Sequence, residues 1–173
     1  VEFIANLPTE EVFTLPHREQ VEGSVRATLP LSYGGTLIED FSLTIKGGHV
    51  VQASAKKGEA ILKKMVEADE GAGRFGEVAL VPVSSPIARR GHLFYDTLID
   101  ENASSHLAVG RAYRISMQDA EGLSEEEFMQ RGGNVSMSHV DFMIGSDKMN
   151  IDGVRADGTL EPVMRKGEWA FEA

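Results

Sequence analysis

The chain has 173 residues, of which 42% are hydrophobic, so it can bury one sizeable core but is short for two independent domains. Its 27 acidic residues outnumber 17 basic ones and give a formal net charge of −10, which disfavours nucleic acid and anionic membranes as partners. Cysteine is absent, which excludes disulfides and thiolate metal ligands and leaves carboxylate and imidazole groups for any metal site.

Short β-strands are expected in the first third of the chain, followed by one helix. Residues 23–28, 36–45 and 49–54 have the alternation or the β-type composition of strands, and the last two flank a Gly-Gly turn. We expect these two to pair as a hairpin. Residues 58–68 carry apolar side chains at intervals of three and four, which predicts an amphipathic helix packed on a sheet.

The middle of the chain combines another strand with a second predicted helix. Residues 78–83 form a nearly unbroken apolar run, which predicts a strand with Glu77 at its entrance. Residues 103–110 predict a short helix, with Asp100 and Asn102 as candidate N-terminal caps.

The last third again alternates between short elements. Ser124 and Glu127 fit a capping box, which predicts a short helix extending to about Arg131. Residues 140–144 predict a strand, and residues 153–163 a hairpin around an Asp-Gly turn. Strands outnumber helices and are joined mostly by tight turns. The predicted class is therefore α+β, with a mostly antiparallel sheet that could close into a barrel-like form and a few short helices.

No apolar run approaches the roughly 20 residues that a membrane-spanning helix needs, and the first residues lack the pattern of a signal peptide. We therefore expect a cytoplasmic protein. The chain opens on an apolar stretch without an initiator Met, so we also expect it to be a fragment of a longer protein.

Seven metal-capable side chains lie at the ends of apolar segments, where a scaffold can hold them rigidly. They are Glu11, Glu77, Glu101, His106, Tyr113, His139 and Asp141. The clearest pair is His139 and Asp141, because residues two apart on a strand point to the same face and can bind one ion. The structural alternative makes His139 a core histidine and Asp141 a turn residue.

Weaker signals come from the other candidates. Glu101 and His106 are five apart at the start of the predicted helix, so both lie near its N-terminus without sharing a face. Their alternatives are a partner of the helix dipole and a buried polar residue. Either Glu10 or Glu11 is expected to reach the interior, where a carboxylate needs a cation, unless both are solvated. Glu77 is expected to be buried, unless it pairs with Arg74.

The sequence has no glycine-rich phosphate loop, no Ser-His-Asp order and no basic aromatic stripe that would indicate nucleotide binding, serine hydrolysis or nucleic-acid recognition. The carboxylate and imidazole set is therefore the one coherent group of candidate functional residues.

Four segments together carry a resemblance to a known family. They are Asn6-Leu-Pro-Thr-Glu-Glu-Val-Phe-Thr14, Gly76-Glu-Val-Ala-Leu-Val-Pro82, Asp100-Glu-Asn-Ala-Ser-Ser-His106 and His139-Val-Asp-Phe-Met-Ile-Gly145. In this order they resemble the aminopeptidase T and aminopeptidase S family of dinuclear metalloaminopeptidases, over residues 6–169. The resemblance implies that the seven side chains are metal ligands, with Glu11 preferred to Glu10 on spacing.

The resemblance also implies a mechanism in which two divalent ions, zinc or cobalt, activate water against a peptide with a free N-terminus. Glu77 would bridge the ions and Glu10 would be the general base. We expect Glu11, His106 and Tyr113 on one ion, and Glu101, His139 and Asp141 on the other.

Members of the family have an additional N-terminal α/β domain and form homodimers around an enclosed site. We therefore expect residues 1–173 to be a single catalytic domain that dimerises and is weakly active or inactive alone. Two other functions stay open: another dinuclear hydrolase acting on amides or phosphoesters, and a metal-stabilised interaction domain without activity.

Overall fold

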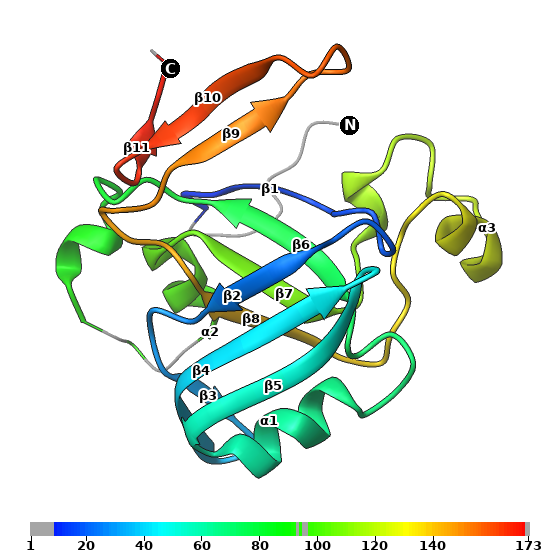
Figure 1. The fold of residues 1–173 in the computed structure, drawn as a ribbon, viewed down its shortest axis with the longest axis horizontal. Helices are drawn as coiled ribbons and strands as arrows, with labels where there is room; N and C mark the ends of the chain where they lie inside the picture. Colours follow the sequence, from blue (N-terminus) through cyan, green and yellow to red (C-terminus); the bar gives the residue numbers. More distant parts are fainter. Residues whose placement is uncertain (1–8, 93, 95–96, 172–173) are drawn as a thin grey trace.

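The structure is a computed structural model that describes residues 9–92, 94 and 97–171. Its strands form three sheets, and every paired strand is antiparallel (Figure 1). We call the first the site sheet; its order is β1 (Val12–Thr14), β6 (Phe75–Leu80), β7 (His106–Gly110), β8 (His139–Met143).

The second sheet is built around the long strand β4 (Thr36–Lys46). Its partners are β2 (Gly23–Arg26), β3 (Leu31–Tyr33) and β5 (His49–Lys57). Helix α1 (Glu59–Val66) follows β5 and buries Leu62, Met65 and Val66 on one side, as the apolar spacing predicts. The expected β4–β5 hairpin and amphipathic helix are both confirmed.

The third sheet is formed near the end of the chain by β9 (Ile151–Val154), β10 (Leu160–Arg165) and β11 (Glu168–Trp169). The remaining elements are short: α2 (Thr97–Asp100), α3 (Glu125–Gln130), η1 (Ala88–Arg90), η2 (Glu101–Ala103) and η3 (Arg114–Ser116). The α+β, mostly antiparallel class is thus confirmed, with three sheets rather than one closed barrel in the described part of the chain.

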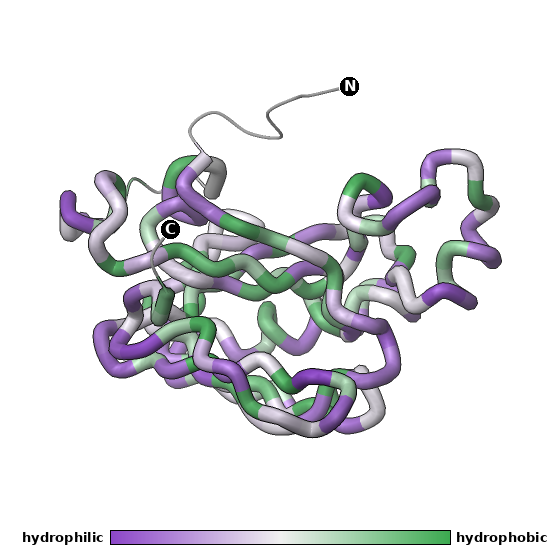
Figure 2. The backbone as a smooth tube through the Cα atoms, turned by 90° about the horizontal axis from the view of Figure 1, so that it is seen from above, coloured by the Kyte–Doolittle hydropathy of each residue, from purple (hydrophilic) through white to green (hydrophobic). Residues whose placement is uncertain are grey.

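The main core lies between one face of the site sheet and the β4 sheet. Phe142 is its centre, with ring centroids 5.5 Å from Phe41 and 6.3 Å from Phe75. Figure 2 shows hydrophobic and hydrophilic residues alternating along much of the backbone. Burial of each of these rings contributes about 1.5–3 kcal/mol, so the site sheet is anchored firmly through one face and its other face is available for polar side chains.

One predicted helix is wrong. The predicted helix over residues 103–110 is the strand β7, preceded by the single turn η2. A short apolar run such as His106–Gly110 fits a buried strand as well as a buried helix, and pairing on both sides with β6 and β8 decides for the strand.

The capping box of α3 is confirmed, and one predicted strand begins earlier than expected. Ser124 caps α3 as predicted: its Oγ accepts a hydrogen bond from Glu127 N (3.2 Å), and Glu127 accepts one from Ser124 N (2.7 Å). The strand predicted over residues 78–83 begins earlier, at Phe75, so Glu77 lies inside β6 rather than at its entrance. Among the described helices, none is both long and apolar enough to cross a bilayer.

Candidate metal centre

One face of the site sheet gathers most of the candidate residues. Glu77 on β6 pairs with Ala108 on β7, which pairs with Asp141 on β8, so these three positions share one face. His106 lies two residues from Ala108 and His139 two residues from Asp141, so both histidines share that face as well. The opposite face carries the core side chains.

A β-bulge at Gly76 turns Glu77 towards this face. Phe75 pairs with Val109 and Glu77 with Ala108, so Gly76 is an extra residue in β6. Without the bulge Phe75 and Glu77 would share a face; with it, Phe75 is buried in the core and Glu77 points the other way. Only glycine fits, because a Cβ at position 76 would lie 2.2 Å from the Arg111 carbonyl oxygen.

The side chains form two groups that share Glu77. In the first, His106 Nε2 lies 3.1 Å from Glu11 Oε2 and 3.4 Å from Glu77 Oε1. In the second, His139 Nε2 lies 3.8 Å from Glu77 Oε2 and 3.2 Å from Asp141 Oδ1. Within each group the candidate ligand atoms lie within 4.8 Å of one another. The two oxygens of Glu77 therefore face different groups, as a bridging carboxylate requires.

Both histidines are oriented in the same way by the backbone. Nδ1 of His106 lies 2.9 Å from the Ser104 carbonyl oxygen, and Nδ1 of His139 lies 2.7 Å from that of Arg111. A carbonyl oxygen only accepts, so each Nδ1 carries the proton that it donates. In the neutral imidazole this leaves the Nε2 lone pair directed at the carboxylates, which is how a metal-binding histidine is held. The residues therefore fit a divalent cation in each group.

The cluster has a buried end and an open end. The side chains of His106 and Glu11 are 0% and 2% exposed, those of Glu77 and Asp141 are each 8% exposed, and that of His139 is 15% exposed. Tyr113 lies beyond His139, with its ring centroid 4.6 Å from the imidazole, and is exposed. The site can thus be reached from the Tyr113 side.

The pKa values of three residues in the cluster are raised. Burial, followed by the charges of Asp141 and Glu11, raises the pKa of Glu101 to about 8. Burial lowers the pKa of His106, but hydrogen bonds to Glu11 and Glu77 outweigh it and raise that pKa to about 10. The pKa of His139 is also raised, because Asp141 outweighs burial. Metal-free protein therefore partly neutralises its carboxylates with protons.

The remaining candidates take different places. The charge of Glu101, on η2, acts on the same cluster, although Glu101 belongs to neither group of three. Tyr113 was expected to share an ion with Glu11 and His106; in the structure its ring contacts that of His139. Arg74, the alternative partner of Glu77, instead lies 3.6 Å from Glu70.

Glu10 belongs to neither group of three. Its backbone N–H donates to Asn102 Oδ1 (2.7 Å), and its carboxylate accepts a hydrogen bond from Ile87 N (3.1 Å). Glu11 thus contacts His106, whereas Glu10 is bound at Ile87. Asn102 and Asp100, the expected helix caps, instead bond to Glu10 and to Phe94 N.

Sequence reasoning missed the residues that support the ligands from behind. Asn134 is fully buried and donates from Nδ2 to the carbonyls of Gly71 (2.8 Å) and Gly110 (2.6 Å), beside Arg111. Ser104 and Arg111 act through backbone carbonyls, which no residue type reveals.

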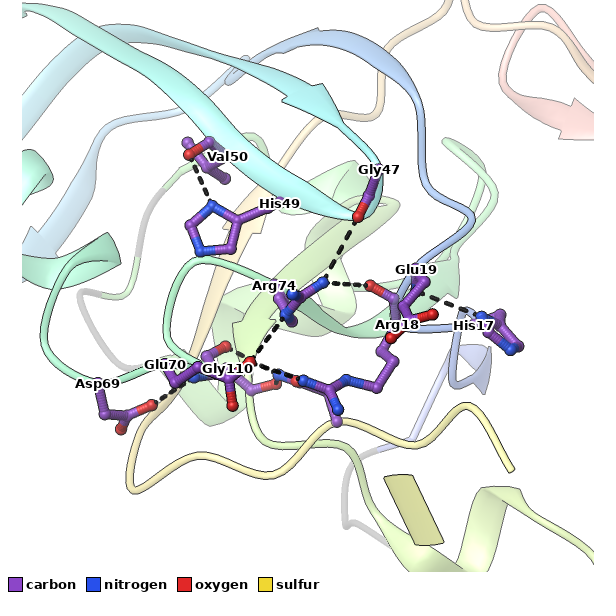
Figure 3. Close-up of polar contacts among 12 residues, drawn as sticks. His17, Arg18, Glu19, Gly47, His49, Val50, Asp69, Glu70, Arg74 and Gly110 are labelled. Atoms are coloured by element: carbon purple, nitrogen blue, oxygen red, sulfur yellow. Dashed lines mark hydrogen bonds and ion pairs between the residues drawn. The ribbon is translucent and has the colours of Figure 1, made fainter. Parts of the chain in front are cut away.

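A second support joins the start of β6 to the end of β7. Gly110 N donates to the Arg74 carbonyl (2.7 Å), and Arg74 in turn donates to the carbonyl of Arg18 (3.2 Å) (Figure 3). Arg18 forms an ion pair with Glu70 at 3.0 Å. This network lies next to the Gly76 bulge in the chain and fixes the strand from which Glu77 projects.

Comparison with known proteins identifies relatives over almost the whole chain. The sequence profile of the family described as thermophilic metalloprotease (M29) matches residues 1–169. Aminopeptidase AmpS of Bacillus subtilis (strain 168) is 57% identical over 170 residues, which are 98% of this chain and 42% of the relative. Aminopeptidase T of Thermus aquaticus is 56% identical over 166 residues, 96% of this chain and 40% of the relative.

A solved structure has the same fold. Wild-type AmpT from Thermus thermophilus superimposes with a TM-score of 0.88 at 54% sequence identity, over 96% of this chain and 41% of that one. The chain therefore spans about two fifths of the length of the relatives that it matches.

Proposed function

The chain belongs to the thermophilic metalloprotease (M29) family, and on that basis we propose that it forms the metal-binding part of an aminopeptidase. It would release the N-terminal residue from peptides with the help of two divalent metal ions, for which zinc and cobalt both suit the carboxylate and imidazole donors. The relatives named aminopeptidases, at 56–57% identity, support this function.

The observation that carries the proposal is the placement of Glu77. Its two oxygens face two separate groups, Glu11 with His106 and His139 with Asp141. A single-ion site would not need this division. We propose Glu77 as the bridge, with the two pairs as ligands of one ion each, and Tyr113 on the His139 side.

When bound, the two ions would supply a Lewis acid for the scissile carbonyl and a nucleophilic water at neutral pH. The protein's own residues prepare that chemistry. Ser104 and Arg111 keep both Nε2 lone pairs available, and the carboxylates supply the negative charge that four positive charges require. Ala79 and Ala108 lie on the same sheet face and carry small side chains between the candidate ligands.

The proton acceptor has two candidates. Glu10 neighbours a ligand, but its carboxylate is held at Ile87 N. Glu101 lies within the electrostatic reach of Asp141 and Glu11, so it could serve as a ligand or as the base. Replacing each with Gln keeps the shape and removes the base.

Metal analysis combined with hydrolysis of leucine p-nitroanilide tests the proposal. We expect metal-dependent hydrolysis, and a Glu77→Gln variant should lose metal because a neutral amide bridges two cations poorly. One of the variants Glu10→Gln and Glu101→Gln should still bind both ions but turn over substrate about 100-fold more slowly, and that variant identifies the base. Loaded protein without hydrolysis, both alone and in a longer chain, would contradict the function.

A longer chain is part of this test because enclosure matters. Peptide hydrolysis needs walls that exclude water and bind the substrate. We propose that residues 1–173 form one domain, and that an added N-terminal α/β domain and a homodimer partner complete those walls. The 173-residue chain alone should then hydrolyse the substrate much more slowly than the longer chain.

A further inference from the structure

A cavity adjoins the open end of the metal centre at Tyr113. Beyond His139, Tyr113 lines a cavity of about 280 Å³ that is otherwise bounded by residues before α3, by α3 itself and by the segment that precedes β8. Its other lining residues are Arg111, Ala112, Arg114, Glu125, Phe128, Asn134 and Val135. If the amine end of a peptide occupies the acidic cluster, the rest of that peptide must leave through this open end.

Arg111 lines the cavity and is held by three hydrogen bonds. Its backbone N donates to the Ser138 carbonyl (2.7 Å), its own carbonyl accepts from His139, and its Nε donates to the Ser136 carbonyl (2.8 Å). The side chain is exposed. Its terminal nitrogens Nη1 and Nη2 have no hydrogen-bond or ion-pair partner in the described part of the chain, so a pre-oriented pair of donors faces solvent.

The other charged residues of the cavity are less available, because Arg114 is only partly exposed and packs against Phe128. Arg114 Nη1 is occupied by the carbonyls of Ala120 (3.1 Å) and Leu123 (2.9 Å), and its guanidinium lies 4.8 Å from the Phe128 ring centroid. Glu125 lines the cavity but forms no ion pair with Arg111. Arg111 is thus the more exposed cation of this wall, and among the described residues neither of its terminal nitrogens has a partner.

We propose that Arg111 binds the free α-carboxylate of the second residue of a dipeptide, and that this part of the substrate occupies the cavity between Tyr113 and α3. The inference rests on the proposed aminopeptidase function. A planar guanidinium with two free nitrogens matches a carboxylate in a two-point contact. The cavity has room for about one residue, which favours a dipeptide over a longer chain.

Binding of an uncleavable dipeptide tests Arg111 without requiring turnover. The probe is the ketomethylene analogue of leucyl-glycine, in which carbon replaces the cleaved nitrogen, compared with the same compound as its C-terminal amide. Both are titrated into the zinc-loaded chain by calorimetry. The acid should bind about tenfold or more tightly than the amide, because only the acid offers a charge to Arg111.

Variants assign that difference to the side chain. Arg111→Met should remove the preference for the acid and leave the affinity for the amide unchanged, while Arg111→Lys should keep part of the preference. Arg155→Met, on the distant β9–β10 hairpin where Arg155 pairs with Glu161, is the matched control and should change nothing. Zinc content and circular dichroism confirm that each variant is folded and loaded.

The outcomes separate the two proposals. Equal affinity for acid and amide in the unmodified chain, or equal weakening of both in Arg111→Met, would overturn the role of Arg111 while leaving the aminopeptidase function intact. If neither compound binds in a zinc-dependent way, the proposed function itself is contradicted, and the inference with it.

Discussion

At the buried end of the metal centre, Glu11 and His106 are almost completely shielded from solvent, whereas at the open end His139 is 15% exposed and Tyr113 42% exposed. Both ends use the same parts: a carboxylate, an imidazole held through Nδ1 by a backbone carbonyl, and one oxygen of Glu77. The difference lies in solvent access. It indicates that an ion at the buried end would be bound more permanently, and that one at the open end would meet substrate and exchange more readily.

Replacing each histidine by alanine should give the largest difference in stability between the two ends. In the metal-free protein at neutral pH, His106→Ala leaves Glu11 and Glu77 buried without a cation and should lower the free energy of unfolding by about 3–5 kcal/mol. His139→Ala leaves its partners nearer to solvent and should cost about 1 kcal/mol. Urea unfolding of both variants measures the difference, and equal losses would show that the two ends are equivalent.

Moving Glu77 should instead affect both ends together. Gly76→Ala places a Cβ against the Arg111 carbonyl and disturbs the bulge that orients Glu77. The substitution should lower the free energy of unfolding by about 1–3 kcal/mol and weaken the binding of both ions. Gly122→Ala is the matched control, since a Cβ there has no atom within 4 Å. Metal titration of the two variants would contradict the role of the bulge if Gly76→Ala bound two ions normally.

A smaller effect is expected in the pH dependence of the stability of the metal-free protein. The pKa of Glu101 is raised from 4.5 to about 8, and that of His106 from 6.5 to about 10, so the folded metal-free protein binds more protons than the unfolded one in both ranges. Its free energy of unfolding should therefore fall as pH rises from about 5 to about 10.

Two comparisons identify the groups responsible. Glu101→Gln should remove the fall in stability between about pH 5 and pH 6.5 and make it less steep up to about pH 8, leaving the fall between about pH 6.5 and pH 10 that His106 causes. Zinc-saturated protein should show the opposite trend over the acidic range, because metal binding requires deprotonated ligands. Thermal melts across this range carry the test, and a metal-free protein that gains stability as pH rises would oppose it.

The sequence predicts the parts of the site that depend on local periodicity. The spacing of His139 and Asp141 on a strand was sufficient to place both on one face, and the four motifs were sufficient to recognise the family. The misassigned helix at His106 shows the limit of periodicity, since a short and mostly apolar segment does not distinguish a buried strand from a helix.

Other features depend on contacts between distant segments. The bulge at Gly76 follows from the register of β6 against β7, which the residue types of β6 do not specify. The carbonyls that orient the histidines belong to Ser104 and Arg111, and any residue provides a carbonyl. The direction in which Glu10 and Glu11 diverge is likewise set by Ile87 and His106, more than 70 residues away.

The central claim is that Glu77 joins two metal ions through its two oxygens. An anomalous-scattering map from a crystal of the zinc-loaded chain tests it directly. The account predicts two zinc peaks, one beside Glu77 Oε1 with Glu11 and His106, the other beside Oε2 with His139 and Asp141. A single peak, or two peaks that Glu77 does not connect, would contradict it.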